Sequence, residues 1–249
     1  TFGQHDFSVL LGYTAEKTTT TTAGITGTAF PTDYIHTLNA ATSITLGPDN
    51  TYTFKEQDAL MSVLGRVNYA YADKYLASVS ARTDGSSKFA KGNRWGWFPS
   101  VSLGWRISEE PFLKKYYWLS SLKLRASWGL TGNNDIANYS VMNKLSSANY
   151  SFGSGTGNVS SGLANPTSVI ANRDITWEQS SEYNYGLDLS LFDNRINFSG
   201  EYYYSETVQM LYQQTALSIT GFQKFWNNIG KVANKGFEFE LRTMNIDKE

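Results

Sequence analysis

The chain has 249 residues, a formal net charge of −1 and a pI near 6.1, which argues against a nucleic-acid partner, since such proteins usually carry a basic stripe. It contains no cysteine, which excludes disulfide frameworks and thiolate metal sites. Aromatic residues make up 15% of the chain, yet the mean hydropathy is −0.37, and no apolar run approaches the ~18 residues of a transmembrane helix. This combination leaves two classes: a soluble all-β domain, or a membrane β-barrel with alternating strands.

Alternation of apolar and polar residues, the mark of a β-strand with two different faces, recurs along almost the whole chain. It predicts eight strands, around residues 7–13, 61–71, 75–81, 101–107, 122–130, 183–191, 196–204 and 237–241. We expect strands of ~9–11 residues, long enough to cross a bilayer, whereas strands of soluble proteins are nearer ~5–6 residues. The polar faces carry small residues and these charged ones: Arg66, Arg82, Arg106, Arg125, Asp188, Glu201, Glu238, Glu240 and Arg242.

Short and long connections alternate between these strands. Tight or moderate turns are predicted at Asp73-Lys74, at Asp193-Asn194 and over residues 108–119. Long polar connections are predicted over residues 17–60, 83–97 and 131–177, with a shorter one at 217–224. Membrane barrels have short turns on the periplasmic side and long loops on the outer side, so the alternation favours a barrel.

Aromatic residues gather at the ends of the predicted strands. The clusters are Tyr69, Tyr71 and Tyr75 at one turn, Tyr116, Tyr117 and Trp118 beside another, and Trp95, Trp97 and Phe98 at an outer end. Rings with a polar tip favour the membrane–water interface, where barrels have two aromatic girdles. Ordinary cross-strand pairing of aromatic residues is the alternative interpretation.

Motifs for catalysis and cofactor binding are missing from the sequence, so we expect neither an enzyme nor a cofactor. The two histidines, His5 and His36, form no metal-binding motif, and Asn158 stands where the last glycine of a dinucleotide-binding G-x-G-x-x-G would lie. Glu238 and Glu240 share a strand face, as a glycosidase acid and nucleophile could. Arg242 follows on the same face, which favours charge balancing inside a lumen instead.

A series of blocks gives a more specific signal: 82–89 (RTDGSSKF), 93–100 (NRWGWFPS), 102–105 (SLGW), 108–112 (SEEPF), 122–125 (LKLR), 129–133 (GLTGN), 177–178 (WE) and 228–238 (NIGKVANKGFE). In sequence and order they resemble the SusC/RagA family of TonB-linked outer-membrane transporters. The resemblance implies an all-β, antiparallel transmembrane β-barrel meander, of which this chain would be a partial barrel of about eight strands. It further implies that residues 1–249 belong to the barrel domain, without the plug domain or the C-terminal strands.

The resemblance implies that the protein imports oligosaccharides or peptides across the outer membrane. The expected partners are a SusD-like surface lipoprotein, the TonB-ExbB-ExbD complex and the surrounding outer-membrane lipid. We expect Arg82, Arg125, Glu201 and Glu238 to line the substrate path, and Tyr34, Tyr150 and Phe152 to bind ligand from the outer loops. The alternatives are a passive porin or adhesin barrel and a soluble glycan-binding β-domain.

Overall fold

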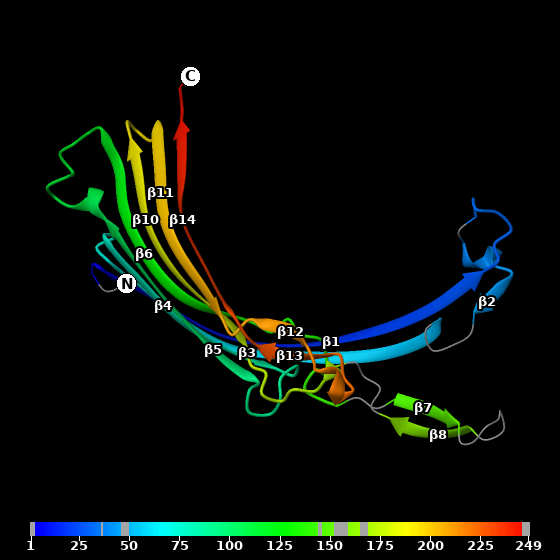
Figure 1. Cartoon of the computed structure of the whole chain (residues 1–249). Coiled ribbons are helices and arrows are strands. Elements are labelled where there is room, and N and C mark those ends of the chain that lie inside the picture. The colour runs from blue at the N-terminus through cyan, green and yellow to red at the C-terminus, as the bar shows by residue number, and fades with distance from the viewer. Residues whose placement is uncertain are drawn as a thin grey trace.

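An antiparallel sheet of nine strands forms the body of the chain (Figure 1). The computed structural model describes residues 3–35, 37–45, 50–143, 146–151, 159–164 and 169–245, with the backbone alone for 146–151, 159–164 and 218. Eight strands of the sheet have 12 to 24 residues, and β2 has 3. In spatial order the strands are β14 (Lys231–Thr243), β11 (Ile196–Val208), β10 (Glu178–Leu191), β6 (Leu119–Asn133), β5 (Trp95–Arg106), β4 (Tyr75–Ser86), β3 (Thr51–Tyr71), β1 (His5–Thr28) and β2 (Ser43–Thr45).

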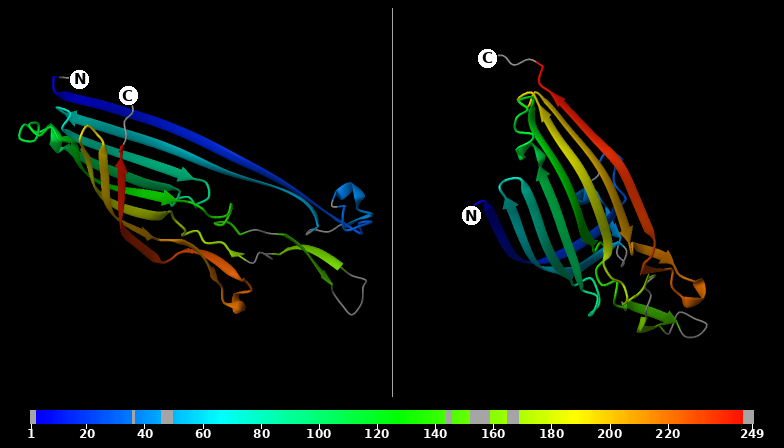
Figure 2. Two further views of the ribbon diagram at one scale, coloured as in Figure 1. Left: turned by 90° about the horizontal axis from the view of Figure 1, so that it is seen from above. Right: turned by 90° about the vertical axis from the view of Figure 1, so that its left-hand side faces the viewer.

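The long strands run up and down in chain order, and the sheet curves like part of a barrel wall (Figure 2). Its two sides remain open, at β14 and at the β1–β2 pair. The predicted all-β, antiparallel partial barrel of about eight strands is therefore confirmed. Among the described residues, no helix is both long and apolar enough to cross a membrane.

Further strands lie in the connections at one end of the sheet. The segment between β6 and β10 contains β7 (Ser146–Ser151), which pairs with β8 (Val159–Ala164), and then β9 (Val169–Ile170). The segment between β11 and β14 contains β12 (Leu211–Thr215) and β13 (Lys224–Asn228), and β13 also pairs with β9. Three short 3-10 helices complete the elements: η1 (Leu38–Ala40), η2 (Ile107–Glu109) and η3 (Ser218–Thr220).

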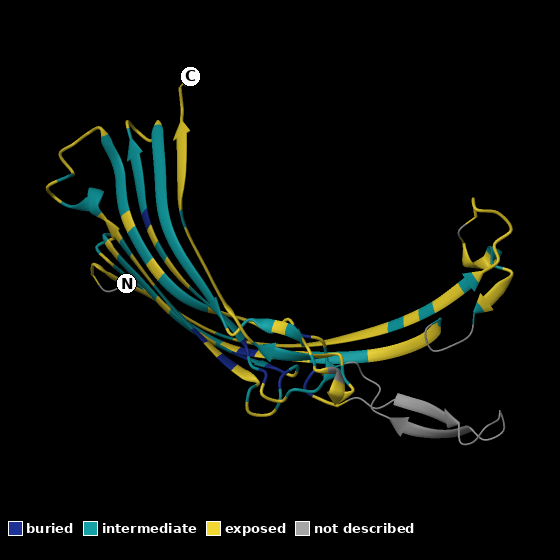
Figure 3. Ribbon diagram, in the orientation of Figure 1, coloured by how far each residue is buried: buried dark blue, intermediate teal, exposed yellow. Residues whose placement is uncertain are grey.

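The two faces of the sheet differ as the alternation predicts. Val79, Leu103, Tyr185 and Phe237 lie on one face and are 56, 57, 53 and 69% exposed. Few residues of the sheet are buried, as Figure 3 shows. A continuous exposed apolar face of this extent is unusual for a soluble monomer, and it suits contact with lipid.

Two predicted loops are shorter than expected, because strands continue into them. The connection predicted over 17–60 is wrong: Lys17 pairs with Ala59 and Ile25 with Thr51, so the true connection is 29–50. Threonine is β-branched and fits a pleated strand, which explains why the Thr18–Thr22 run extends β1. The connection predicted over 83–97 shrinks to 87–94, because β4 and β5 stay paired up to Gly85 and Trp95.

The predicted tight turns are confirmed at the opposite end of the sheet. Ala72 and Asp73 have φ of 51° and 54°, and Lys74 N donates to Tyr71 O at 2.9 Å, as in a hairpin turn of type I′. The aromatic cluster at this turn is also present: the Tyr75 ring centroid lies 6.3 Å from those of both Tyr71 and Trp105. These rings pair across strands, which confirms the cross-strand interpretation, and the aromatic girdle at a membrane interface stays a prediction.

Glu110, which follows η2, ties three elements together at the turn end. Its carboxylate accepts hydrogen bonds from Tyr75 Oη at 2.7 Å, Trp105 Nε1 at 3.2 Å and Lys74 Nζ at 3.2 Å. These interactions favour the ionised carboxylate and lower the pKa of Glu110, with the Tyr75 hydrogen bond as the largest cause. Because the pKa falls on folding, the contribution to stability is present at neutral pH and is lost as the pH falls through the lowered value.

We predict that Leu103→Arg in the full-length protein destabilises the barrel by about 1–2 kcal/mol, because Leu103 lies two residues from Trp105 at the turn end, and arginine on a lipid face costs about 2–4 kcal/mol at the bilayer midplane but about 0–1 kcal/mol near the interface. The neighbouring variant Ser102→Arg places the same side chain on the polar face and serves as the control. Urea unfolding from lipid vesicles measures both. Equal destabilisation by the two variants would show that the apolar face does not contact lipid.

We predict that Glu110→Gln lowers the thermal unfolding midpoint at neutral pH and that this difference disappears as the pH falls below 4.5, the ordinary pKa. Thermal unfolding of the detergent-solubilised protein over a pH series tests this. Glu109→Gln is the control, because the ion pair that Glu109 forms among the described residues is a local one, to Lys114 at 2.9 Å. A difference between wild type and Glu110→Gln that does not change with pH would contradict the assignment.

Candidate functional site at the loop end of the barrel

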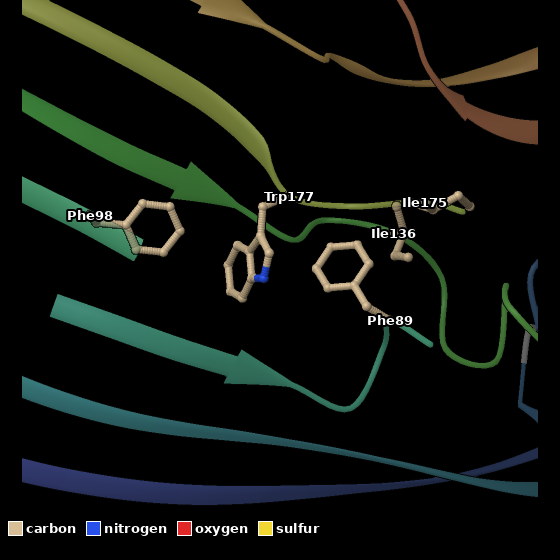
Figure 4. Close-up of a cluster of buried hydrophobic side chains, with 5 residues drawn as sticks. All are labelled: Phe89, Phe98, Ile136, Ile175 and Trp177. Carbon is tan, nitrogen blue, oxygen red and sulfur yellow. The ribbon is translucent and has the colours of Figure 1, made fainter. Parts of the chain in front are cut away.

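Five buried side chains from separate segments meet at the loop end of the sheet (Figure 4). Phe89 comes from the β4–β5 loop, Phe98 from β5, Ile136 from the segment after β6, and Ile175 and Trp177 from the segment before β10. All are at most 7% exposed, and the Trp177 ring centroid lies 5.3 Å from Phe89 and 5.4 Å from Phe98. We call this group the loop brace, because it joins connections that are far apart in the sequence.

Two glycines make room for the loop brace. A Cβ atom at Gly96 or at Gly132 would overlap the ring of Phe98. Any side chain at either position would therefore displace the ring. Both glycines belong to blocks that carry the family resemblance, and the packing of Phe98 gives a physical reason for glycine there.

Hydrogen bonds extend the loop brace into the β4–β5 loop. Trp177 Nε1 donates to Arg94 O at 2.9 Å, and Arg94 Nε donates to Phe89 O at 3.2 Å. Asn134 Nδ2 donates to Ser86 Oγ at 3.0 Å. Both ends of the segment between β6 and β10 are thus bound to the end of β4 and the loop that follows it.

Asn228 and Glu178 bind the connection between β11 and β14 to the residues beside β6 and β10. Asn228 accepts from Thr176 N at 2.8 Å, and its Nδ2 group donates to Thr176 O at 2.9 Å and to Gln209 O at 2.8 Å. The Glu178 carboxylate accepts from Asn133 Nδ2 at 3.1 Å and from Leu211 N at 2.8 Å. Sequence reasoning singled out these motif residues but missed this role, because it depends on contacts between distant segments.

Arg82 lies on the polar face, close to the loop end of the sheet. Its Nε donates to Asp84 Oδ1 at 2.7 Å and Oδ2 at 2.8 Å, and its Nη2 donates to Ser62 Oγ at 3.0 Å. Asp84 is 7% exposed and Ser62 is 1% exposed. Arg82 therefore compensates a nearly buried carboxylate while remaining partly accessible itself.

Arg125 on β6 and Glu201 on β11 form an ion pair on the polar face, over the intervening strand β10. Arg125 Nη2 lies 2.6 Å from Glu201 Oε2, and Arg125 Nε lies 3.4 Å from Asp188 Oδ2. Asn184 Nδ2 also donates to Glu201. Glu238 lies directly opposite Glu201 on β14. Of the predicted lining residues, the structure thus brings Arg125, Glu201 and Glu238 together, with Arg82 nearer the loops.

The other predicted residues take different places. Tyr34 lies between β1 and β2 and is 94% exposed, so it makes little contact with the rest of the chain. Tyr150 lies on β7, where the backbone alone is described, and Phe152 and His36 fall outside the described residues. Glu240 forms an ion pair with Arg242 at 3.0 Å, in keeping with charge balancing. In the part of the chain that the structure describes, no group of three or more His, Asp or Glu could hold a metal ion.

Two cavities lie on the polar face. One, of ≈ 390 Å³, reaches from β1 to β10, and its lining includes Asp6, Ser8, Asn68, Lys123 and Arg125. The other, of ≈ 490 Å³, lies beside the loop brace and is lined by Arg66, Arg82, Ser100, Phe98 and Trp177 among others. Hydroxyl, amide and charged groups line both cavities, and this chemistry fits the lumen-facing side of a barrel.

Comparison with known proteins places this architecture in a family. Residues 1–245 match the family model described as TonB dependent receptor-like, beta-barrel. The chain belongs to the TonB-dependent receptor β-barrel family and is part of a bacterial outer-membrane barrel.

Individual relatives agree with the SusC/RagA resemblance. The chain is 35% identical over its full length to TonB-dependent receptor P3 of Formosa agariphila, covering 24% of that protein. It is 36% identical to TonB-dependent receptor SusC of Bacteroides thetaiotaomicron over 78% of the chain and 19% of that protein. Among solved structures, the RagAB peptide transporter aligns with a TM-score of 0.80 and 28% identity over 96% of the chain, and over 26% of the RagAB chain.

We predict that Trp177→Ala loosens the loops, because it removes the ring that joins Phe89 to Phe98 and leaves a cavity costing about 3–5 kcal/mol. Limited proteolysis of the full-length protein should then cut residues 87–94 and 134–143 faster than in the wild type. Trp97→Ala is the matched control, since Trp97 is 59% exposed on the apolar face. Unchanged cutting in Trp177→Ala would show that the loops are held without the brace.

Proposed function

We propose that the chain forms part of the barrel wall of a TonB-energised outer-membrane importer for oligosaccharides or peptides. The observation that carries this proposal is the two-faced sheet in this family. The apolar face suits lipid, and the polar face has one cavity beside the loop brace and another that reaches towards the turn end. A solute moving along the lumen would meet Arg82, Arg125, Glu201 and Glu238. The exposed apolar face argues against the alternative of a soluble glycan-binding domain.

The remaining parts of the importer are proposed from the relatives. The chain spans about a quarter of the length of the first relatives that it matches. We infer that further strands complete the two open sides of the sheet, since a sheet in lipid must pair its edge N–H and C=O groups. A plug domain would fill the lumen, TonB-ExbB-ExbD would supply energy, and a SusD-like lipoprotein would cover the loop end.

The relatives and the polar face support a polar oligomer as the substrate, either a saccharide or a peptide. One relative by structure is described as a peptide transporter, and SusC is a relative by sequence. Serine, asparagine and charged side chains on the polar face can bind either the hydroxyls of a saccharide or the amides of a peptide.

Uptake by cells tests the proposal. A strain with an in-frame deletion of the complete gene, and the same strain carrying the gene on a plasmid, would be supplied with fluorescent oligosaccharides and peptides larger than a general porin admits. We expect uptake of at least one class to require the gene and to stop when a protonophore collapses the proton gradient. Uptake that needs the gene but continues with the protonophore would identify the passive porin alternative. No difference between the strains for either class would refute import.

A further inference from the structure

The cavity beside the loop brace contains an arginine that has no hydrogen bond or ion pair to any residue the structure describes. Arg66 on β3 lines this cavity of ≈ 490 Å³, and within the described ranges its side chain has no ion pair and no hydrogen bond. Arg82, Arg125 and Arg242, on the same face, all have carboxylate partners. Arg66 is therefore free to bind an incoming group.

The surroundings of Arg66 leave its charge uncompensated. Ser80 lies opposite it on β4, and Ser80 Oγ is 2.6 Å from Ser100 Oγ on β5. Arg82 and Asp84 are the other charged residues that line the cavity. Two arginines against one aspartate leave this cavity with a net charge of +1.

Arg82 can assist Arg66. It uses Nε for Asp84 and Nη2 for Ser62, which leaves the Nη1 donors without an acceptor among the described residues. Arg82 lies opposite Leu64, two residues from Arg66 along β3, so the two arginines are diagonal neighbours. Such neighbours are about 7–8 Å apart, which allows both side chains to reach one anionic group.

We propose that Arg66, assisted by Arg82, forms a subsite for a carboxylate group of the transported molecule on the lumen wall. The planar guanidinium fork matches the two oxygens of a carboxylate, and the neighbouring serine hydroxyls can donate to the same group. The carboxylate can belong to a uronic acid unit of a saccharide or to an acidic residue of a peptide. This inference rests on the proposed function, because it assumes that a solute enters the lumen.

Equilibrium binding to the purified full-length protein in detergent tests the subsite. The probes are trigalacturonate and its neutral counterpart maltotriose, and N-acetyl-triglutamate and its neutral counterpart N-acetyl-trialanine amide. We expect one acidic probe to bind about tenfold more tightly than its neutral counterpart, since a bidentate, charge-assisted contact contributes on this scale. Preference for trigalacturonate would indicate a uronic acid, and preference for the triglutamate would indicate an acidic peptide.

The decisive variant is Arg66→Gln, which breaks no hydrogen bond or ion pair among the described residues and should abolish the preference. Arg66→Lys, which keeps the charge without the fork, should retain part of it. Arg106→Gln is the matched control: Arg106 is an exposed arginine on the same face, has no ion pair with any described residue, and lies at the turn end outside the cavity. The proposal is overturned if the wild type shows no preference for either acidic probe, or if Arg66→Gln keeps it. Binding in detergent needs no proton gradient, so this result is independent of the uptake experiment.

Discussion

Backbone pairing between neighbouring strands is the constraint on which the rest of this structure depends. Inside a bilayer, no water is available for an N–H or C=O group, so a strand is stable only beside another strand. The meander satisfies this requirement because each long strand pairs with the long strands before and after it in the chain, across tight turns at one end and longer connections at the other. Each paired strand then has one face for lipid and one for the lumen, and both the apolar surface and the polar cavities follow from this arrangement.

The loop brace provides the buried apolar packing that the single-layered sheet lacks. Single-layered strands bury few side chains, and the buried apolar cluster lies instead where the loops meet the end of the sheet. Phe89, Phe98 and Trp177 hold connections whose own sequences are mostly polar. Rigid loops at a barrel mouth can present binding groups at fixed positions, as binding loops on a rigid scaffold do.

Charges on the lumen wall are distributed unevenly. Arg125 is paired with Glu201 and Asp188, whereas Arg66, opposite Ser80 in the middle of β4, has no ion pair or hydrogen bond among the described residues. Paired charges keep the wall hydrophilic without attracting a particular ion, while an unpaired guanidinium attracts carboxylates. The difference between these two arginines is the physical basis for a subsite in the cavity beside the loop brace.

The sequence by itself determined the strands, their two faces and the tight turns, because alternation along a strand and turn chemistry at residues such as Asp73 are local properties. It misjudged where β1 and β3 end, since the threonine run could be a loop or a strand until pairing with residues 51–59 decided the matter. Only the tertiary structure showed the loop brace and the Arg125–Glu201 pair, whose members lie 76 residues apart in the chain. Such contacts arise from strand register and loop packing, and no local pattern near Trp177 or Arg125 specifies their partners.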